Sequence, residues 1–211
     1  MMIMAIENGS SGSEEYLLDQ MHALRAKVFK DRLRWQVLAR DGRERDAFDD
    51  LDPVYILAVT AGDNVVGCAR LLPALGPTML LSVFPQLVTD QTFLPHARMV
   101  ESSRFCVDTA VQRTGGEVLH QISHWMFAGI LEWCLLREDT EVVTVTDIGV
   151  ERILQRAGWP LRRLGSPQKI GRGNALAGVL DVDRATFELV KPAGYVSNFG
   201  GGSAPTPTVS S

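Results

Sequence analysis

Residues 55–72 read Tyr55-Ile-Leu-Ala-Val-Thr60-Ala-Gly-Asp-Asn64-Val65-Val-Gly-Cys68-Ala-Arg70-Leu-Leu72. Two apolar runs, 55–60 and 65–72, flank the turn sequence Ala-Gly-Asp-Asn, and this pattern predicts a β-hairpin. Alternation along the second run would place Arg70 on one face with Val66, Cys68 and Leu72. A guanidinium on an apolar face is costly unless carboxylates pair with it, so this strand predicts a buried charged cluster.

The elements around this hairpin alternate between strand and helix. Before it, 1–6 reads as a strand, and Leu17, Met21, Leu24 and Val28 recur at helical spacing. Residues 31–53 read as a loop-rich excursion, and such a long excursion in a compact domain is usually functional. After the hairpin we expect strands at 99–105, 142–146, 161–164 and 175–182, and helices at 117–136, 150–157 and 183–190. This order predicts an α/β three-layer sandwich, a mixed central sheet with helices on both faces, and it resembles the GNAT type of N-acyltransferase.

The composition is that of a compact intracellular protein. The 211 residues, 45% of them hydrophobic, suit a single domain at 1–196, followed by a flexible Gly/Ser/Pro-rich tail at 197–211. A formal net charge of -4 argues against a nucleic-acid partner. An odd number of cysteines without a close pair suits a reducing compartment, and no apolar run is long enough for a membrane span. We therefore expect a cytoplasmic protein without a membrane partner.

Further charges lie where the fold could bring them to the Arg70 guanidinium. Glu44, Asp46 and Asp49 belong to the excursion, and Glu101 and Arg104 to the strand at 99–105. Glu101 and Arg104 would face opposite sides of a regular strand, and a β-bulge between them would turn one side chain to the other face. The set is either an ion-pair network that pins the excursion to the sheet or a pocket for a charged substrate.

S-adenosylmethionine suits the second interpretation because it carries an ammonium, a carboxylate and a sulfonium. Acidic residues would hold its cationic parts: Asp46, Asp49 and Glu101. Arg25 or Arg104 would hold its carboxylate. Phe29 and Trp35 would attract the sulfonium and stack on the adenine.

The same residues carry a resemblance to a known family. The N-terminal signature of the LuxI-type acyl-homoserine lactone synthases resembles Arg25-Ala-Lys-Val-Phe29, Arg32-Leu-Arg-Trp35 and Asp41-Gly-Arg-Glu44-Arg-Asp46-Ala-Phe-Asp49. The match continues in the same order with Tyr55-Ile-Leu-Ala, Cys68-Ala-Arg70-Leu-Leu and Val100-Glu101-Ser-Ser-Arg104-Phe. The resemblance covers most of the chain and is greatest to the rhizobial members.

This resemblance implies an acyltransferase of quorum sensing. Such an enzyme transfers an acyl chain from acyl carrier protein to the amine of S-adenosylmethionine, then closes the lactone ring with release of methylthioadenosine. S-adenosylmethionine is a substrate, and no cofactor or metal is implied. The family's catalytic positions map onto Glu44, Asp46, Asp49, Arg70, Glu101 and Arg104, with Arg25, Phe29, Trp35 and Phe84 beside them. Glu101 is the candidate base, acting through a water.

An acyl pocket is expected next to this set. In this family a threonine on the strand after the long helix is associated with 3-oxo-acyl substrates, and Thr144 takes that place, with Thr146 on the same face as the alternative. The other expected lining residues are Phe84, Ser102, Met126, Ile130 and Val150. Each of them taken singly also fits ordinary core packing.

The stretch 150–175 is unusually basic for an acidic chain. Its single acidic residue is Glu151, and its basic residues are Arg152, Arg156, Arg162, Arg163, Lys169 and Arg172. Acyl carrier proteins are acidic, so complementary charge would steer docking to this segment. A solvated surface is the alternative reading.

Two other functions remain open from the sequence. A CoA-dependent N-acyltransferase of the GNAT type would need a pyrophosphate loop at Gln112-Arg-Thr-Gly115-Gly-Glu117, where the Glu117 carboxylate would repel the pyrophosphate. A non-catalytic sensor that binds S-adenosylmethionine or a lactone is the other alternative. His120 and His124 have the spacing of a metal face, but they lack a catalytic metal motif.

Overall fold

The computed structural model describes residues 1–7, 12–110, 117–171 and 173–199. One large sheet runs through these residues in the strand order β1 (Met2–Ile6), β4 (Val54–Val59), β5 (Val65–Pro73), β6 (Met99–Val107), β7 (Glu141–Asp147), β10 (Gly173–Asp181) and β8 (Arg162–Arg163). The short strand β9 (Gln168–Ile170) also pairs with β10. The β6–β7 pair is parallel, whereas the other pairs of this sheet are antiparallel.

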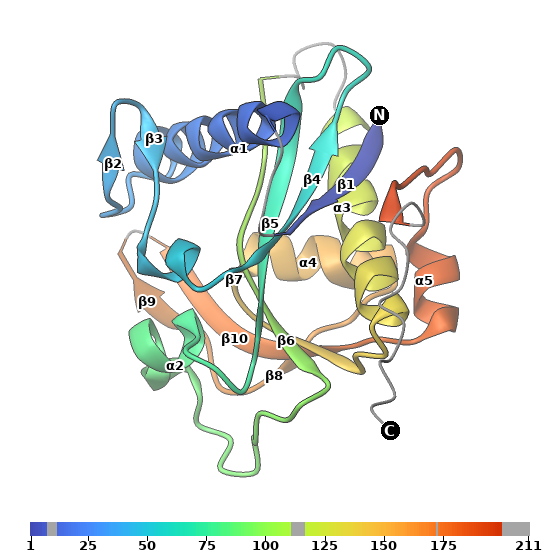
Figure 1. The fold of residues 1–211 in the computed structure, drawn as a ribbon. Helices are drawn as coiled ribbons and strands as arrows, with labels where there is room; N and C mark the ends of the chain where they lie inside the picture. Colours follow the sequence, from blue (N-terminus) through green and yellow to red (C-terminus); the bar gives the residue numbers. More distant parts are fainter. Residues whose placement is uncertain (8–11, 111–116, 172, 200–211) are drawn as a thin grey trace, which may run out of the picture.

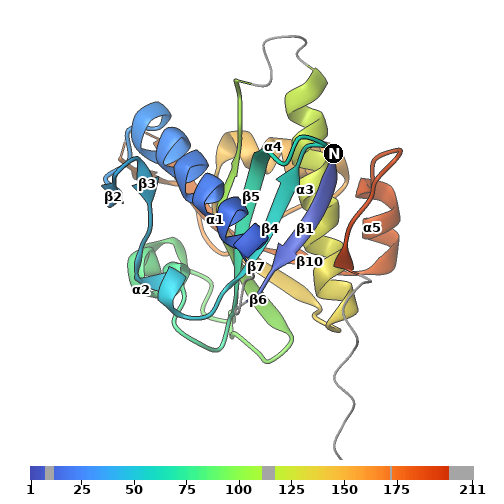
Figure 2. The same ribbon diagram turned by 45° about the horizontal axis from the view of Figure 1, so that its top comes forward.

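Helices cover both faces of this sheet (Figures 1 and 2). One face carries α1 (Gly12–Arg25), which continues as the π-helical η1 (Ala26–Arg32), and α2 (Met79–Val83) with the 3-10 helix η3 (Pro85–Leu87). The other face carries α3 (Glu117–Leu136), α4 (Ile148–Ala157) and α5 (Arg184–Val190). The predicted three-layer α/β architecture is confirmed. None of the helices in the described residues is long and apolar enough to cross a membrane.

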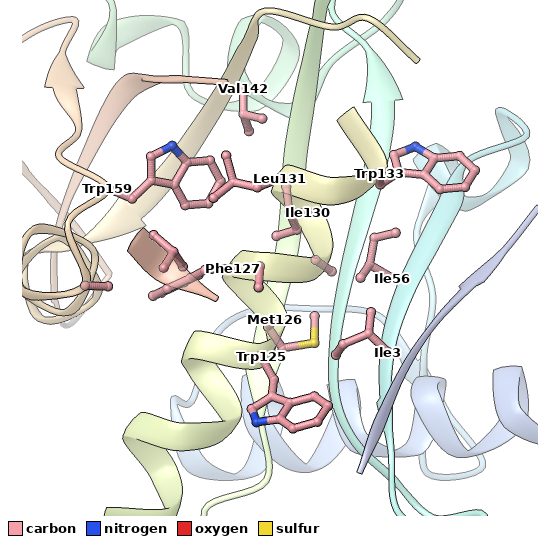
Figure 3. Close-up of a cluster of buried hydrophobic side chains, with 14 of the residues drawn as sticks. Ile3, Ile56, Trp125, Met126, Phe127, Ile130, Leu131, Trp133, Val142 and Trp159 are labelled. Atoms are coloured by element: carbon pink, nitrogen blue, oxygen red, sulfur yellow. The ribbon is translucent and has the colours of Figure 1, made fainter. Parts of the chain in front are cut away.

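The main core lies between α3 and the sheet (Figure 3). The sequence of α3 is apolar on most of its surface, and a helix of that kind is stable only when other elements surround it. Met126 and Ile130 are buried in this core, and Gly129 lets the helix approach β1 closely. A Cβ atom at Gly129 would lie 2.6 Å from Cγ2 of Ile3, so a larger residue would force the helix away.

The excursion at 31–53 contains regular pieces that the sequence pattern did not predict. The strands β2 (Ala39–Arg40) and β3 (Arg43–Glu44) form a separate two-stranded sheet. The 3-10 helix η2 (Ala47–Asp50) follows, capped by Asp46, whose side chain accepts from the backbone N–H of Phe48. Elements of two to four residues are too short for a hydrophobic period, so local hydrogen bonds define them instead.

The predicted hairpin at 55–72 is confirmed, but one expected side-chain direction is wrong. Val59 pairs with Val65, whereas Ala58 pairs with Gly67, so Val66 is an extra residue in β5. This β-bulge reverses the alternation, and Val66 packs on the α3 side while Cys68 packs on the α1 side. Arg70 therefore lies on the α1 side.

The last described residues contact the domain. Ser197 bridges Ile3, the backbone N–H of Asn198 donates to the Ile3 carbonyl at 3.0 Å, and the Phe199 ring lies 5.6 Å from the Trp133 ring. The sequence places the start of a flexible tail at 197, whereas these residues pack against β1 and α3. The tail residues 200–211 lie outside the described part of the chain.

Candidate active site

Three guanidinium groups and three carboxylates meet between α1 and the sheet. The arginines are Arg25 at the end of α1, Arg70 on β5 and Arg104 on β6; the acids are Glu44 on β3, Asp46 before η2 and Asp49 within it. Each carboxylate contacts at least two arginines, and Asp46 also lies 3.9 Å from Arg25, so the contacts close into a ring that alternates in charge. We call these six residues the ion-pair ring.

The contacts around the ring are short. In order they join Arg25 Nε to Glu44 Oε2 (2.5 Å), Glu44 Oε1 to Arg104 Nη2 (3.0 Å), Arg104 Nη2 to Asp46 Oδ2 (2.6 Å), Asp46 Oδ1 to Arg70 Nη1 (2.6 Å), Arg70 Nη1 to Asp49 Oδ1 (2.8 Å), and Asp49 Oδ1 to Arg25 Nη1 (2.7 Å). Charge-assisted bonds of this length are the strong class of protein hydrogen bond. The sequence prediction of a charged cluster around Arg70 is confirmed.

A β-bulge brings Arg104 into the ring. Cys68 pairs with Cys106 but Arg70 pairs with Ser103, so β6 carries one more residue than β5 over this stretch. Arg104 has a φ of +54°, in the left-handed region that costs roughly 1–2 kcal/mol for a residue with a Cβ. A bulge was predicted between Glu101 and Arg104; the observed register shift lies between Ser103 and Cys106, and it turns Arg104 to the face that carries Arg70.

Burial divides the ring into an enclosed part and an open edge. Arg25, Glu44 and Arg70 are fully buried, and the side chain of Asp49 is 1% exposed. The side chains of Asp46 and Arg104 are 17% and 10% exposed. The prediction that Arg25 holds a substrate carboxylate does not match this geometry, because Glu44 and Asp49 enclose its guanidinium.

Asp49 is surrounded by hydrogen-bond donors. Its carboxylate accepts from Arg25, Arg70, the Tyr55 hydroxyl and the backbone N–H of Asp46. Burial alone would raise the pKa of Asp49, but the Arg25 and Arg70 guanidinium groups outweigh burial and hold the pKa well below its usual range. Asp49 is thus an ionised support for the arginines and offers no open face to a substrate.

Glu101 lies beside the ring but belongs to a different set of contacts. Its two carboxylate oxygens accept the backbone N–H groups of Met79 (2.9 Å) and Leu80 (2.6 Å) at the start of α2. It is 1% exposed, and burial raises its pKa even though the two N–H bonds oppose the shift. The geometry shows Glu101 anchoring α2, and its role as a base that acts through a water stays a prediction.

Aromatic rings lie next to the open edge. The Arg104 guanidinium lies 5.4 Å from the centre of the Phe29 ring, and Phe29 stacks on Trp35 at 5.2 Å with 22° between the ring planes. Trp35 is 42% exposed. Of the two aromatic residues predicted from sequence, Trp35 extends the open edge of the ring with an exposed apolar face, and Phe29, which is 3% exposed, lies buried behind it.

The predicted acyl-pocket residues lie on two faces of the sheet. Met126 and Ile130 are in the α3 core, Val150 packs against that core, and the Thr144 hydroxyl donates to the Ser102 carbonyl at 2.8 Å. Phe84 packs against the cluster below α2 on the opposite face. The sheet thus separates Phe84 from the other five residues.

The β6–β7 ladder ends at the Ser102–Thr144 pair. Both strands continue beyond it, and their side chains become partly exposed there, at Arg104 and Phe105 on β6 and at Val145 and Thr146 on β7. This point lies one residue from the β6 bulge, so the open edge of the ring and the end of the ladder are neighbours.

The predicted docking residues are all on the surface, but two of the positive charges are paired. Arg163 donates to Glu151 at 2.6 and 2.7 Å, and Arg162 lies 3.0 Å from Glu141. The remaining charges of this segment are exposed at Arg152, Arg156 and Lys169. Arg172 lies outside the described residues.

Two further sequence features concern the start of α3. Residues 111–116, and with them most of the stretch from Gln112 to Glu117, lie outside the described part of the chain, as do the side chains of Glu117 and His120. Among the described side chains, no group of His, Cys, Asp and Glu has an arrangement that could hold a metal.

Three residues that sequence reasoning missed contact the ring. The Ser103 hydroxyl accepts from Arg70 Nε at 3.1 Å, the Met79 sulfur lies 3.1 Å from Arg70 Nη2, and the Tyr55 hydroxyl donates to Asp49 at 2.8 Å. A signal for Tyr55 was present in the sequence. A hairpin closed between residues 60 and 65 places Tyr55 opposite Arg70, and the structure has this pairing.

The mixed sheet, the parallel β6–β7 pair, the helices on both faces and the charged site define an α/β enzyme of the N-acyltransferase type. The solved structure of BjaI, a CoA-dependent acyl-homoserine lactone synthase with SAM and isopentyl-CoA, has the same fold. It matches with a TM-score of 0.79 at 29% identity, over 90% of this chain and 87% of that chain.

Sequence comparisons narrow the class to one family. The family model described as autoinducer synthase matches residues 10–190. The chain is 51% identical over 205 residues to a probable acyl-homoserine-lactone synthase of Sinorhizobium fredii (95% of this chain, 99% of the relative). It is 54% identical over 181 residues to the acyl-homoserine-lactone synthase of Agrobacterium fabrum (85% and 86%). The chain belongs to the autoinducer synthase family and is an acyltransferase that makes acyl-homoserine lactones, as its resemblance to rhizobial members predicted.

Proposed function

We propose that this acyl-homoserine-lactone synthase joins a 3-oxo-acyl chain from acyl carrier protein to S-adenosylmethionine bound at the Asp46–Arg104 edge. The observation that carries the proposal is the division of the ion-pair ring. Four of its members are enclosed, while one carboxylate and one guanidinium reach solvent beside Phe29 and Trp35.

The open edge has the groups that S-adenosylmethionine needs. Asp46 would take the ammonium, Arg104 the carboxylate, and the Phe29–Trp35 surface the sulfonium and adenine. The similar structure of BjaI holds SAM, which supports S-adenosylmethionine as the amine substrate. The enclosed members, Arg25, Glu44, Asp49 and Arg70, would keep Asp46 and Arg104 in position, because preorganised charges need no rearrangement during the reaction.

Two bond-forming steps follow from this placement. The neutral amine attacks the thioester carbonyl, forms the amide and expels the thiol of the donor. A carboxylate oxygen then attacks the γ-carbon and displaces methylthioadenosine, which closes the lactone. The substrate ammonium must lose its proton to solvent before it attacks, and a free α-amino group has a pKa of about 8, so part of the unbound substrate is already neutral near pH 7–8. Positioning of the two substrates is then the main contribution of the protein.

The acyl chain is proposed to enter where the β6–β7 ladder ends. Phe105, Val145 and Thr146 are half-buried there, and Thr144 and Ser102 form the last rung. The Thr144 hydroxyl donates to the Ser102 carbonyl and would turn to a 3-oxo group when one is bound. Met126, Ile130 and Val150 would line the inner end of the chain, and Phe84 lies on the other face of the sheet.

Acyl carrier protein is the proposed donor because Arg152 and Arg156 on α4 and Lys169 on β9 are exposed positive charges that would attract an acidic partner. Acyl-CoA is the second candidate donor, and the likeness to the CoA-dependent BjaI supports it. The cytoplasm, a reducing compartment, suits the three buried free cysteines.

The test is incubation of the purified protein with S-adenosylmethionine and a panel of acyl and 3-oxo-acyl thioesters of carrier protein and of CoA, with products followed by mass spectrometry. We expect lactone and methylthioadenosine together, with the 3-oxo-acyl carrier protein as the best donor. Higher kcat/KM with acyl-CoA would overturn the donor assignment. If the protein binds S-adenosylmethionine but forms no product with any donor, the proposed enzymatic function is wrong and a sensor is favoured.

A further inference from the structure

We infer that Tyr55 is a positioning residue for S-adenosylmethionine, acting through Asp49 on the Asp46–Arg104 edge. The inference rests on the proposed binding of S-adenosylmethionine at that edge and adds a residue of the central sheet to the machinery that shapes it.

The Tyr55 hydroxyl meets the ring where two positive charges converge. It donates to Asp49 Oδ1 at 2.8 Å, and the same oxygen accepts from Arg25 Nη1 at 2.7 Å and from Arg70 Nη1 at 2.8 Å. Tyr55 is 7% exposed, and its ring meets the His22 ring edge-on at 6.2 Å. The His22 ring therefore contacts the ring of Tyr55, and the Tyr55 hydroxyl donates to a single oxygen atom, Asp49 Oδ1.

Asp49 connects this hydroxyl directly to the open edge. Asp49 Oδ2 accepts the backbone N–H of Asp46 at 2.8 Å, and the Asp46 side chain accepts from the N–H of Phe48 at 2.9 Å. The first of these bonds belongs to the capping box of η2, in which the Asp46 side chain accepts from the backbone of Asp49 in return, so a displaced Asp49 displaces the backbone of Asp46. The path from Tyr55 to the substrate-facing carboxylate has two hydrogen bonds.

The two ends of this path differ in how firmly the fold holds them. Tyr55 belongs to β4, which pairs with β1 on one side and β5 on the other, and its neighbours Ile56 and Leu57 are fully buried. Asp49 belongs to a four-residue 3-10 helix in the excursion, where Leu51 and Asp52 are exposed. A hydrogen bond from a core strand therefore fixes the position of a residue that its own segment holds weakly.

The hydroxyl stays a donor throughout the working pH range. Burial and the adjacent Asp49 carboxylate raise the pKa of Tyr55 above its usual value, so the phenol keeps its proton. The guanidinium groups of Arg25 and Arg70 repel each other at Asp49 Oδ1. The Tyr55 hydroxyl is a third, neutral donor, so it helps to fix the position of this oxygen without adding charge.

Tyr55→Phe in the full chain tests the inference, with Tyr195→Phe as the matched control. Tyr195 also donates its hydroxyl to a partly buried carboxylate, Glu132 Oε2 at 2.8 Å, but lies against α3 and α5 on the other face of the sheet. With the carrier-protein thioester fixed at saturation, we expect Tyr55→Phe to raise KM for S-adenosylmethionine about tenfold with a change in kcat below about threefold. Tyr195→Phe should change neither by more than about twofold.

Folding and ligand binding are measured separately. Melting curves set an assay temperature at which both variants are folded, and calorimetry of S-adenosylmethionine binding gives Kd without turnover. Site-specific 3-fluorotyrosine at position 55 retains the hydroxyl and should restore the wild-type KM within about twofold. Equal KM and Kd for the folded Tyr55→Phe and Tyr195→Phe variants would overturn the inference. A wild-type protein that binds S-adenosylmethionine but forms no lactone would overturn the enzymatic reaction and leave the Kd comparison as the test of Tyr55.

Discussion

Asp46 Oδ2 lies 2.6 Å from Arg104 Nη2, and these two side chains carry most of the exposed area of the ion-pair ring. The charges behind them are enclosed and mutually paired, and in the proposed function they would fix the direction of the exposed pair rather than contact the substrate. The left-handed backbone of Arg104 is part of the same arrangement, since only the bulge turns its side chain to this face. Strained backbone of this kind is often found at functional sites.

Replacing Arg104 with Lys should reduce activity strongly. A lysine has a single nitrogen at the end of its side chain, whereas Arg104 contacts Glu44 through both Nε and Nη2 and Asp46 through Nη2. We expect kcat/KM for S-adenosylmethionine to fall by about 30- to 100-fold, the loss of one charge-assisted bond. Steady-state kinetics measures the change, and Arg98→Lys, on an exposed arginine before β6, is the control. Equal kinetics for the two variants would contradict a substrate-facing role for Arg104.

Breaking the enclosed part of the ring should destabilise the fold. Glu44→Gln leaves the fully buried Arg25 with one charged partner fewer, and removal of one member of a buried pair costs about 3–5 kcal/mol. Urea unfolding at pH 7 measures the difference in unfolding free energy. A loss below about 1 kcal/mol would show that the enclosed charges do not support the domain.

The sequence predicted the charged cluster but not its division into an inner part and an edge. Arg70 in an apolar strand requires carboxylates, and the family signature supplies Glu44, Asp46 and Asp49. Which of these reach solvent depends on how η2 and β3 close over Arg25, and no period in residues 33–50 encodes that closure. A bulge near Arg104 could be predicted because Glu101 and Arg104 would otherwise face opposite sides of the same strand. The bulge at Val66 could not be predicted, because a valine fits an apolar environment on either face of the sheet.

Stability should depend on pH through Asp49. Its pKa is lowered in the folded protein, so its ion pairs contribute stability above the unfolded value of about 3.9, and that stability is lost as the pH falls toward the folded value. Urea midpoints between pH 3 and 7 should fall steeply for the wild type below about pH 5. Asp49→Asn should be less stable at pH 7 and show a shallower decline over the same range. If the urea midpoints of the wild type and of Asp49→Asn decline in parallel with pH, the stabilising role of the Asp49 ion pairs is contradicted.

Glu101 should act as the anchor of α2. Glu101→Gln keeps one acceptor for the two N–H groups of Met79 and Leu80, so hydrogen exchange in residues 79–83 should become faster. The pH profile of kcat should keep its shape in this variant, because the substrate amine sets it. Unchanged exchange together with a lost pH dependence would identify Glu101 as the base instead.

The Glu101 pKa also gives a stability prediction of opposite sign to that of Asp49. Because burial raises the pKa in the folded state, the wild type should lose stability as the pH rises from the unfolded value of about 4.3 through the folded value. Glu101→Gln should remove this component of the pH dependence. If the urea midpoints of the wild type and of Glu101→Gln fall equally across pH 4–8, Glu101 makes no such contribution to the pH dependence of stability.

Thr144 should determine the preference for a 3-oxo group. Thr144→Val removes the hydroxyl but keeps the shape of the side chain, so kcat/KM should fall about tenfold for 3-oxo-acyl donors and change little for unsubstituted ones. Thr146→Val, on the same strand and outside the last rung of the β6–β7 ladder, is the control. A larger effect at Thr146 would transfer the role to that residue.

The elements that the sequence missed share a physical origin. Both are too short to show a period: α2 has five residues and is held by Glu101 from a distant strand, and β9 has three residues that pair with Gly173 to Ala175 just after it. Long elements with a clear period, such as α3 and the β4–β5 hairpin, were predicted with boundaries close to those observed.

The central claim is that S-adenosylmethionine binds at the Asp46–Arg104 edge, and a crystal structure of the protein with S-adenosylmethionine tests it most directly. The account predicts the substrate carboxylate within hydrogen-bond distance of Arg104, the ammonium at Asp46, and the adenine or sulfonium against Phe29 and Trp35, with Arg25 still enclosed. S-adenosylmethionine bound on the α3 face of the sheet, or in direct contact with Arg25, would contradict it.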